Sequence, residues 1–385
     1  METFDVVVIG AGLAGLEITR ALSKSGLSVL LADRKTSLEK PVHTTGIFVR
    51  RTLEDFELPL DCLGAVVRHV NLYAPSGRSL ELESPHAEYR VGNMAKLYGQ
   101  MLEEAQQLGA VFSNATHFRG SSKAIHGSVV HLERLGQDFT IKAKLIVGAD
   151  GAVSKVAMDL KLERNSKFLV GVEDVFEGMP LEGKPCFHVF LDPKIAPGYI
   201  AWLINDGEHV HLGTGGDAAK FDAVQALEAF KHKLNSRFDF SRATLLERRG
   251  GRIPVGGMLK KIANTRGLLI GDAAGAVSPL TAGGLDPAIR ISRYAAKVIH
   301  HALAVNDLRL LEAYNNSQWQ KSFQTRLWLR RLLSSINNPA LLELGVAAAS
   351  LPGLKSIAWK IFFGRGTRTS SEPIHPNGLQ SKLKS

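Results

Sequence analysis

Residues 4–33 read FDVVVIGAGLAGLEITRALSKSGLSVLLAD, and this stretch decides the fold. The run at 4–9 is continuously apolar, which is typical of a strand buried on both faces of a parallel sheet. A helix is expected to follow through 16–25 and to end at Gly26, because glycine favours helix C-termini. Residues 27–32 then form a second buried strand. The pattern predicts a β-α-β unit at the start of a parallel sheet.

Three glycines occupy the turn between that strand and helix, with the spacing Gly10-x-Gly12-x-x-Gly15. In this context the first makes a tight turn, the second lets a pyrophosphate approach the backbone, and the third lets the helix pack closely. The helix N-terminus supplies N–H groups and a positive dipole end to phosphates. Asp33 ends the second strand, where a carboxylate binds ribose hydroxyls and disfavours the 2′-phosphate of NADP.

Two later clusters combine glycine with aspartate: GADG at 148–151 and GDAAG at 271–275, the latter followed by Pro279 and Gly283-Gly284. A strand delivers Asp272 to a turn, where its carboxylate can accept from a ribitol hydroxyl. Gly284 opens a helix whose amides can face the electron-rich edge of an isoalloxazine. Three such clusters in this order indicate one long cofactor, FAD.

The segments between these clusters alternate in character. Strands and turns dominate 61–89 and 168–213, whereas 94–108, 221–234 and 284–304 have helical periodicity. We therefore expect an α/β protein with a discontinuous, Rossmann-like FAD-binding domain, an inserted antiparallel β-sheet substrate domain and a C-terminal helical region. The expected boundaries are 1–60 with 90–160 and 250–305 for the FAD domain, 61–89 with 161–249 for the substrate domain, 306–364 for the helices, and 365–385 for a disordered tail.

Composition narrows the class of protein. The chain has 385 residues, enough for about two domains, and an ordinary 22% of charged residues. Cys62 and Cys186 form neither a disulfide framework nor a metal-ligand spacing, so we expect no metal and a reducing compartment. The N-terminus leads into a strand rather than a signal peptide, and no run of about 18 apolar residues occurs. A cytoplasmic protein is expected.

Most of the net charge of +10 lies at the C-terminal end, where 318–385 carry ten Lys or Arg against Glu343 and Glu372. These basic residues stand among Leu, Trp and Phe, as in RLWLRRLL at 326–333, which fits an anionic membrane better than nucleic acid. Two interpretations stay open. The region is a helical cap alone, or a cap that also contacts the inner face of a membrane.

The motifs GAGLAG, GADG and GDAAGAVSPLTAGGLDPA together resemble FAD-dependent oxidoreductases of the para-hydroxybenzoate hydroxylase type, and among them most closely the geranylgeranyl reductase family. The resemblance covers about 4–300. It implies that 40–51 (KPVHTTGIFVRR) fold over the flavin, that Arg90 contacts FAD, and that 198–204 form a strand beside the substrate. The implied cofactor contacts are Gly10, Gly12, Ala14, Gly15, Asp33, Thr44, Thr45, Arg90, Asp150, Gly271, Asp272, Pro279, Gly283, Gly284 and Leu285.

The chain departs from this family where the substrate should be recognised. Thr44 and Thr45 replace a family cysteine before Gly46, Ile204 and Asn205 replace Phe and Pro after Trp202, and Ala282 stands where glycine is common. Catalytic residues are therefore unknown, with weak candidates in His43, Thr44 and Trp202; His43 titrates near neutral pH and could donate a proton.

Two further histidines, His209 and His211, alternate along one expected strand, and we interpret both as surface residues of the sheet.

The leading hypothesis is an FAD-dependent reductase of a hydrophobic, prenyl-like or lipid substrate, with NADH or NADPH as transient electron donor. The alternatives are a flavin monooxygenase acting on an aromatic or lipid substrate and, less favoured, a halogenase-like enzyme. The halogenase alternative is weaker because only one tryptophan and no proline are present around Trp202.

Overall fold

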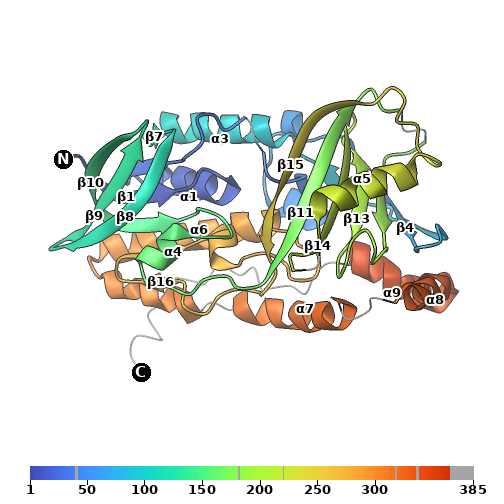
Figure 1. The fold of residues 1–385 in the computed structure, drawn as a ribbon. Helices are drawn as coiled ribbons and strands as arrows, with labels where there is room; N and C mark the ends of the chain where they lie inside the picture. The colour runs from blue at the N-terminus through green and yellow to red at the C-terminus, as the bar shows by residue number, and fades with distance from the viewer. Residues whose placement is uncertain (40–41, 181–182, 220, 317–318, 335–337, 365–385) are drawn as a thin grey trace.

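The computed structural model describes residues 1–39, 42–180, 183–219, 221–316, 319–334 and 338–364. The expected disordered tail, 365–385, lies outside the described residues. Two large β-sheets stand at opposite ends of an elongated molecule, and helices fill the space beside and beneath them (Figure 1). This arrangement confirms the expected fold class: α/β, with an inserted antiparallel sheet and helices at the C-terminal end. The exact domain boundaries stay a prediction.

The first sheet is built around parallel strands, as the buried apolar runs predict. β1 pairs in parallel with β2 and β10, and β10 pairs in parallel with β17. The hairpin of β8 and β9 continues antiparallel from β10. The strand order is β16 (Ala263–Asn264), β17 (Gly267–Leu269), β10 (Gln137–Gly148), β1 (Thr3–Ile9), β2 (Val29–Ala32) and β7 (Val111–Ser113), with β9 (Gly127–Arg134) and β8 (Thr116–Ala124) beyond β10.

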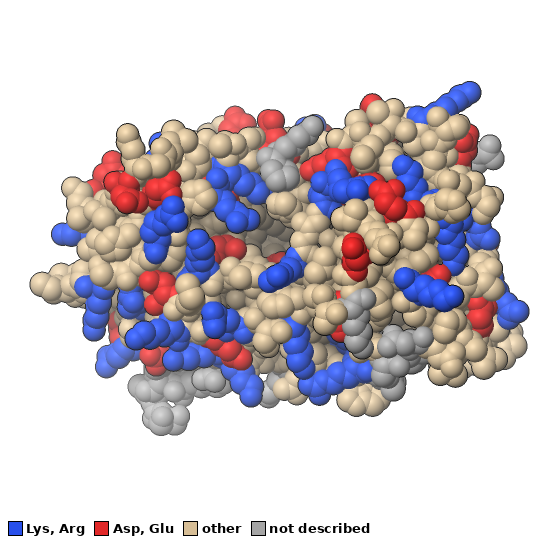
Figure 2. Space-filling view, in the orientation of Figure 1, with Lys and Arg blue, Asp and Glu red and all other residues tan. Residues whose placement is uncertain are grey.

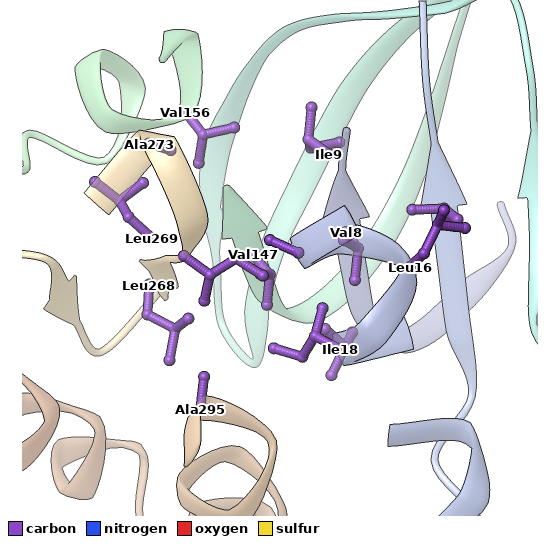
Figure 3. Packing of buried hydrophobic residues seen from close by; sticks show 14 of the residues in the cluster. Val8, Ile9, Leu16, Ile18, Val147, Val156, Leu268, Leu269, Ala273 and Ala295 are labelled. Carbon is purple, nitrogen blue, oxygen red and sulfur yellow. The ribbon is translucent and has the colours of Figure 1, made fainter. Parts of the chain in front are cut away.

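The core of this half lies between the sheet and helices α1 (Leu13–Lys24), α3 (Met94–Gln107) and α6 (Leu285–Ala304). Val8, Val147, Leu268, Ile18 and Ala295 meet there, from three strands and two helices (Figure 3). All five are fully buried. Helix α4 (Lys155–Asp159) follows β10. This packing fixes the ends of the three adjacent strands, on which the glycine clusters lie.

The second sheet is largely antiparallel and has seven strands among the described residues. Their order is β15 (Thr244–Pro254), β11 (Phe168–Glu177), β14 (Val210–Asp217), β13 (Ala201–Asn205), β12 (Cys186–Phe190), β4 (His69–Tyr73) and β5 (Ser79–Glu83). Helix α5 (Ala223–Leu234) packs on one face through Leu227 and Phe230. We call the opposite face, which carries Trp202, the inner face. A small sheet of β3 (Ile47–Val49) and β6 (Tyr89–Val91) connects the two halves.

The remaining short elements are α2 (Arg50–Asp55) and the 3₁₀ turns η1 (Leu60–Cys62), η2 (Gly271–Ala274) and η3 (Leu308–Asn316). The C-terminal region continues through α7 (Trp319–Ser334), α8 (Pro339–Ala349) and α9 (Pro352–Phe363). Helices α8 and α9 dock on the second sheet, where Trp359 Nε1 donates to the Glu83 carbonyl at 2.9 Å. No single helix of the described chain has the length and apolarity to span a membrane, although α8 and α9 meet those criteria as a pair bent by 106°.

Candidate active site

The structure brings the three glycine clusters together at one edge of the first sheet. They follow the adjacent parallel strands β1, β10 and β17, in which Ile9 pairs with Gly148 and Gly148 pairs with Leu269. A Cβ on Gly271 would lie 2.8 Å from the Ala14 Cβ, so the third cluster touches the first helix turn. The carboxyl edge of a parallel sheet is where such folds bind their ligands.

The glycine loop before α1 leaves open space where a pyrophosphate is expected. A Cβ on Gly10 would lie 2.3 Å from the Ala149 carbonyl oxygen, and one on Gly15 would lie 1.8 Å from the Gly10 carbonyl oxygen. Gly12 differs, since no heavy atom of the described chain, other than those of its sequence neighbours, lies within 4 Å of its Cβ position. Among the described residues no side chain caps α1, so its first N–H groups remain able to donate to a phosphate. The loop therefore fits a dinucleotide.

Asp33 supports this loop from the end of β2. Its Oδ2 accepts from the Ala11 amide at 2.6 Å, and its Oδ1 accepts from the Lys35 amide at 2.8 Å. Each carboxylate oxygen can accept a second hydrogen bond, so both oxygens can still bind ribose hydroxyls. The predicted ribose contact thus agrees with the position of Asp33 beside the loop.

Asp150 has a structural use that the sequence did not reveal. Its carboxylate accepts from the Ser154 hydroxyl at 2.6 Å and from the amides of Lys155 and Val156 at 2.7 and 3.1 Å. Burial raises the pKa of Asp150, and these hydrogen bonds oppose that rise. The GADG cluster therefore caps α4, and a cofactor contact by Asp150 stays a prediction.

Asp272 is the carboxylate with the clearest need for a ligand. Among the described residues no side chain or amide donates to its carboxylate, and burial raises its pKa to about 6. Its Oδ1 lies 3.4 Å from the Cβ position of Gly284, the residue that begins α6 without a side-chain cap. Asp272 is partly exposed, and both oxygens of its carboxylate keep free acceptor sites for a ligand. A ribitol hydroxyl fits this position.

The loop from Ser278 to Gly284 carries the remaining predicted contacts of this cluster. Ala282 has φ +52°, the left-handed region that favours glycine. The Tyr199 hydroxyl donates to the Thr281 carbonyl at 2.6 Å, and the Arg330 guanidinium donates to the Pro279 carbonyl at 3.2 Å. The loop is therefore held from the second sheet and from α7. Gly283 and Leu285 flank Gly284 at the start of α6.

The segment expected to fold over the flavin is described from residue 42 onward, and we call its residues 42–46, which precede β3, the cover loop. Thr44 Oγ1 accepts from the Gly46 amide at 3.1 Å, while the Thr45 hydroxyl donates to Glu173 on the inner face. Arg90, opposite Phe48 in the small sheet, donates to the carbonyls of Leu63 and Gly64 at 2.8 and 2.7 Å. Its guanidinium thus braces the chain, and its expected FAD contact stays a prediction.

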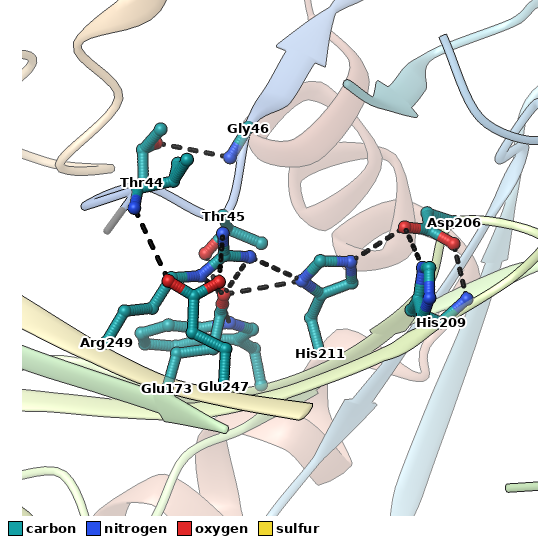
Figure 4. A network of polar contacts seen from close by, with 11 residues as sticks. Thr44, Thr45, Gly46, Glu173, Asp206, His209, His211, Glu247 and Arg249 are labelled. Atoms are coloured by element: carbon teal, nitrogen blue, oxygen red, sulfur yellow. Dashed lines mark hydrogen bonds and ion pairs between the residues drawn. The ribbon is translucent and has the colours of Figure 1, made fainter. Parts of the chain in front are cut away.

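Below the cover loop lies a buried network of charged side chains (Figure 4). Glu173 accepts from Arg249 Nε at 2.8 Å and from Trp202 Nε1 at 2.8 Å. His211 lies between two carboxylates, with Nδ1 3.4 Å from Glu173 and Nε2 3.0 Å from Asp206. Arg249 Nη2 also lies 2.8 Å from His211 Nδ1, so in the neutral ring Nδ1 accepts from Arg249 while Nε2 donates to Asp206.

The charges of this network determine its protonation. Burial alone would raise the pKa of Glu173, but His211, Arg249 and Thr45 lower it to about 2. Burial likewise opposes ionisation of Asp206, whose pKa is nevertheless lowered to about 2 by His211 and neighbouring amides. Burial depresses the pKa of His211, yet Asp206 and Glu173 raise it above its ordinary value. The two carboxylates therefore stay ionised at neutral pH.

The weak candidates for catalytic residues lie in different surroundings. His43 is exposed, and partial desolvation together with the charge of Lys35 lowers its pKa. Trp202 is buried in the apolar cluster of the inner face, with only its N–H turned to Glu173. The expectation of two surface histidines is wrong for His211, which is 5% exposed. His209 is half-buried and lies before β14.

Sequence reasoning also missed Glu173 and Arg249 as parts of this site. A signal was present: Glu173 interrupts an apolar run predicted to be a buried strand, and a buried charge needs partners. Those partners come from β14 and β15, more than 30 residues away in the chain, so the local sequence did not identify them.

Comparisons with known proteins agree with this geometry. A family model described as an FAD binding domain matches residues 3–322. The digeranylgeranylglycerophospholipid reductase of Methanocaldococcus jannaschii is 27% identical over 365 residues, covering 92% of this chain and 93% of that protein. Digeranylgeranylglycerophospholipid reductase 1 of Methanococcoides burtonii is 27% identical over 341 residues, covering 84% and 81%.

Solved structures show the same fold. A geranylgeranyl bacteriochlorophyll reductase-like protein from Thermoplasma acidophilum has a TM-score of 0.83 at 20% identity, covering 100% of this chain and 99% of that one. The flavin-dependent brominase Bmp2 has a TM-score of 0.72 at 15% identity, covering 99% and 98%. With residues that fit FAD at the edge of the first sheet, and a family model matching most of its length, the chain belongs to the FAD binding domain family and is an FAD-dependent oxidoreductase.

Proposed function

We propose that this protein reduces carbon–carbon double bonds of an isoprenoid lipid, with FAD as its resident cofactor and NADH or NADPH as its electron donor. The named relatives act on digeranylgeranylglycerophospholipids, which supports a lipid of this class. When bound, FAD supplies hydride chemistry. In this proposal Gly12 would hold the pyrophosphate, Asp33 the ribose and Asp272 the ribitol.

The observation that carries the lipid assignment is an apolar cluster that runs from the cover loop to the C-terminal helices. It begins at Ile47, directly after the cover loop, and continues through Trp202 and Ile204 on the inner face. It ends at Val346 of α8 and Phe363 of α9. An isoprenoid chain offers only apolar contacts, and this packed cluster, which we call the apolar wall, is the apolar region that adjoins the cover loop.

The outer surface of α8 and α9 suggests how such a lipid arrives. Six large apolar side chains there are 42–65% exposed, namely Leu341, Leu344, Leu351, Leu354, Ile357 and Ile361. Lys355 and Lys360 are exposed beside them on α9. Apolar side chains next to lysines suit the interface of an anionic membrane. These helices would hold the protein at a membrane surface while their inner side continues the apolar wall.

The face of the molecule seen in Figure 2 is hollowed between the halves that carry the two sheets, and Lys and Arg side chains stand around the opening. This is the side on which an electron donor with negatively charged phosphates would be attracted by the local charge. NADH or NADPH would bind only transiently on this side, close enough to reach the flavin, and so would need no separate nucleotide-binding domain.

The test is an anaerobic assay of the protein loaded with FAD. NADH and NADPH are added separately, and bleaching of the flavin absorbance identifies the donor. Digeranylgeranylglycerophospholipid in detergent is then supplied, and mass spectrometry should find products heavier by two hydrogens per reduced double bond. A flavin that is reduced while the lipid mass stays unchanged, with an oxygenated product formed only in air, would replace the reductase by a monooxygenase.

Gly12→Val provides a matched control for this assay. The Cβ position of Gly12 has open space around it in the described structure, and its φ is −78°. A valine therefore fits the folded chain but occupies the space assigned to the pyrophosphate. We expect a folded protein with the melting temperature of cofactor-free wild type, which retains no FAD and reduces no lipid.

A further inference from the structure

One carboxylate oxygen of Glu173 joins the cover loop to Trp202 of the apolar wall. Its Oε2 accepts from the Thr45 hydroxyl and, at 2.8 Å, from Trp202 Nε1. Its Oε1 accepts from Arg249, with Nε at 2.8 Å and Nη2 at 2.7 Å, and lies 3.4 Å from His211 Nδ1. Each donor comes from a different segment, so this carboxylate is where the loop, β13, β14 and β15 meet (Figure 4).

The surroundings decide which protonation state this group can have. Thr45, Trp202 and Arg249 all donate hydrogen bonds to this carboxylate. If it were protonated, its own hydrogen would face the hydrogen of one of these donors. The pKa of Glu173, which its neighbours lower to about 2 against the effect of burial, agrees with this geometry. Glu173 is therefore an acceptor and not a proton donor for the reaction.

We propose that Glu173 is a positioning residue, which fixes the cover loop and the Trp202 indole relative to each other. It thereby sets the distance between the cover loop and the apolar wall. This inference deepens the proposed function and rests on it. The indole has little freedom, because its ring lies against the backbone of Gly213. The loop therefore takes its position from the indole through the shared carboxylate oxygen.

The neighbouring residue offers a comparison that separates positioning from simple stabilisation. Asp174 is also buried in β11, and its carboxylate accepts from Arg248 at 2.7 and 2.8 Å. Side chains alternate along a strand, so Asp174 faces the side of α5, where Arg248 also contacts Glu228. The two residues thus share burial, strand and an arginine partner from β15, but only Glu173 contacts the cover loop.

The experiment compares Glu173→Gln and Thr45→Val with the control Asp174→Asn. Hydrogen exchange of peptides that cover 42–46 is measured in the protein without cofactor, and the absorption spectrum of bound FAD is recorded afterwards. We expect loop exchange at least about 10-fold faster and a shifted flavin band in the first two variants. Asp174→Asn should lower the melting temperature while exchange and spectrum stay those of wild type. Thr45→Ser, which keeps the hydroxyl, should restore both readouts.

The possible outcomes separate this inference from the proposed function. Wild-type exchange at 42–46 in both Thr45→Val and Glu173→Gln overturns the positioning role, and so does an equal effect of Asp174→Asn. If Glu173→Gln does not fold, loop exchange in Thr45→Val alone tests the positioning role. Thr45→Val should fold, since it removes one hydroxyl and no charge. These readouts need no lipid, so failure of the wild type to reduce lipid overturns the function alone. With an active enzyme, Thr45→Val should lower kcat about 10-fold and change KM less than 3-fold.

Discussion

The Trp202 indole lies directly over Gly213, its partner across β13 and β14, and a Cβ at position 213 would lie 2.2 Å from the ring. The hydrogen bond to Glu173 keeps the ring from moving aside. We therefore expect Gly213→Ala to lower the free energy of unfolding by about 1–3 kcal/mol, the usual cost of overpacking.

Urea denaturation measures this loss, and Gly251→Ala on β15 is its control. In the part of the chain that the structure describes, no residue other than its sequence neighbours comes within 4 Å of the Cβ position of Gly251, so alanine there should change stability by less than about 0.5 kcal/mol. Equal losses in the two variants would show that contact with the indole is not the cause.

Asp272 predicts a conflict between stability and cofactor binding. Burial raises its pKa from 3.8 to about 6. A carboxyl whose pKa is raised on folding destabilises the folded state above that pKa, here by about 3 kcal/mol at neutral pH, and the penalty disappears as pH falls below 3.8. Asp272→Asn should therefore melt at a higher temperature than wild type without cofactor at pH 7, yet bind FAD roughly 10- to 100-fold more weakly.

Calorimetry at pH 7 and pH 4 and a fluorescence titration with FAD would check both halves of this prediction. Asp150→Ala is the contrasting variant, because it removes the acceptor of three hydrogen bonds at the start of α4 and should cost about 1 kcal/mol. A cofactor-free Asp272→Asn protein that is less stable than wild type at pH 7 would argue against an unpartnered carboxylate.

Glu173 predicts the opposite response to acid. Its pKa is lowered on folding from 4.5 to about 2. The stabilisation from its ionised form is complete above pH 4.5 and is lost as pH falls through 2, which amounts to about 3 kcal/mol. The stability of wild type should fall more steeply than that of Glu173→Gln between these two pH values. Parallel denaturation curves at pH 5, 4 and 3 measure the difference, and identical slopes would contradict it.

Sequence reasoning predicted the first sheet well because its signals are local. β1, β2 and β17 are buried apolar runs, and Gly15 is required by a contact within its own turn, with the Gly10 carbonyl oxygen. β15 was missed because four of its eleven residues are charged and two are glycines, and its strand character depends on pairing with β11. His211 was misplaced for a related reason. Alternation shows which residues share a face of a strand, but not which segment covers that face.

Ala282 predicts a stabilising substitution. Its φ of +52° lies in the left-handed region, which costs an alanine roughly 1 kcal/mol relative to glycine. Ala282→Gly should therefore raise the free energy of unfolding by about 0.5–1 kcal/mol. Ala226→Gly, within α5, should lower it by about 1 kcal/mol. Thermal melts distinguish the two signs, and a loss of stability in both variants would show that Ala282 is not strained.

The outer surface of α8 and α9 predicts binding to anionic vesicles. The double substitution Leu344→Glu with Ile357→Glu places charge on side chains that are 65% and 54% exposed, so the fold should keep its melting temperature. Sedimentation with vesicles of phosphatidylglycerol and phosphatidylcholine should pellet wild type but not this variant. Binding should also weaken between about 0.1 and 0.5 M salt, because the attraction of Lys355 and Lys360 to the lipid is screened.

The control for this surface is Ile125→Glu, in the turn between β8 and β9 of the first sheet. Ile125 is 94% exposed, so the substitution adds one charge at an apolar position far from α8 and α9. It should pellet with vesicles as wild type does. If all three proteins pellet equally, the contact does not use α8 and α9. If none pellets even at low salt, the C-terminal helices are a cap alone, and the lipid must reach the apolar wall by another route.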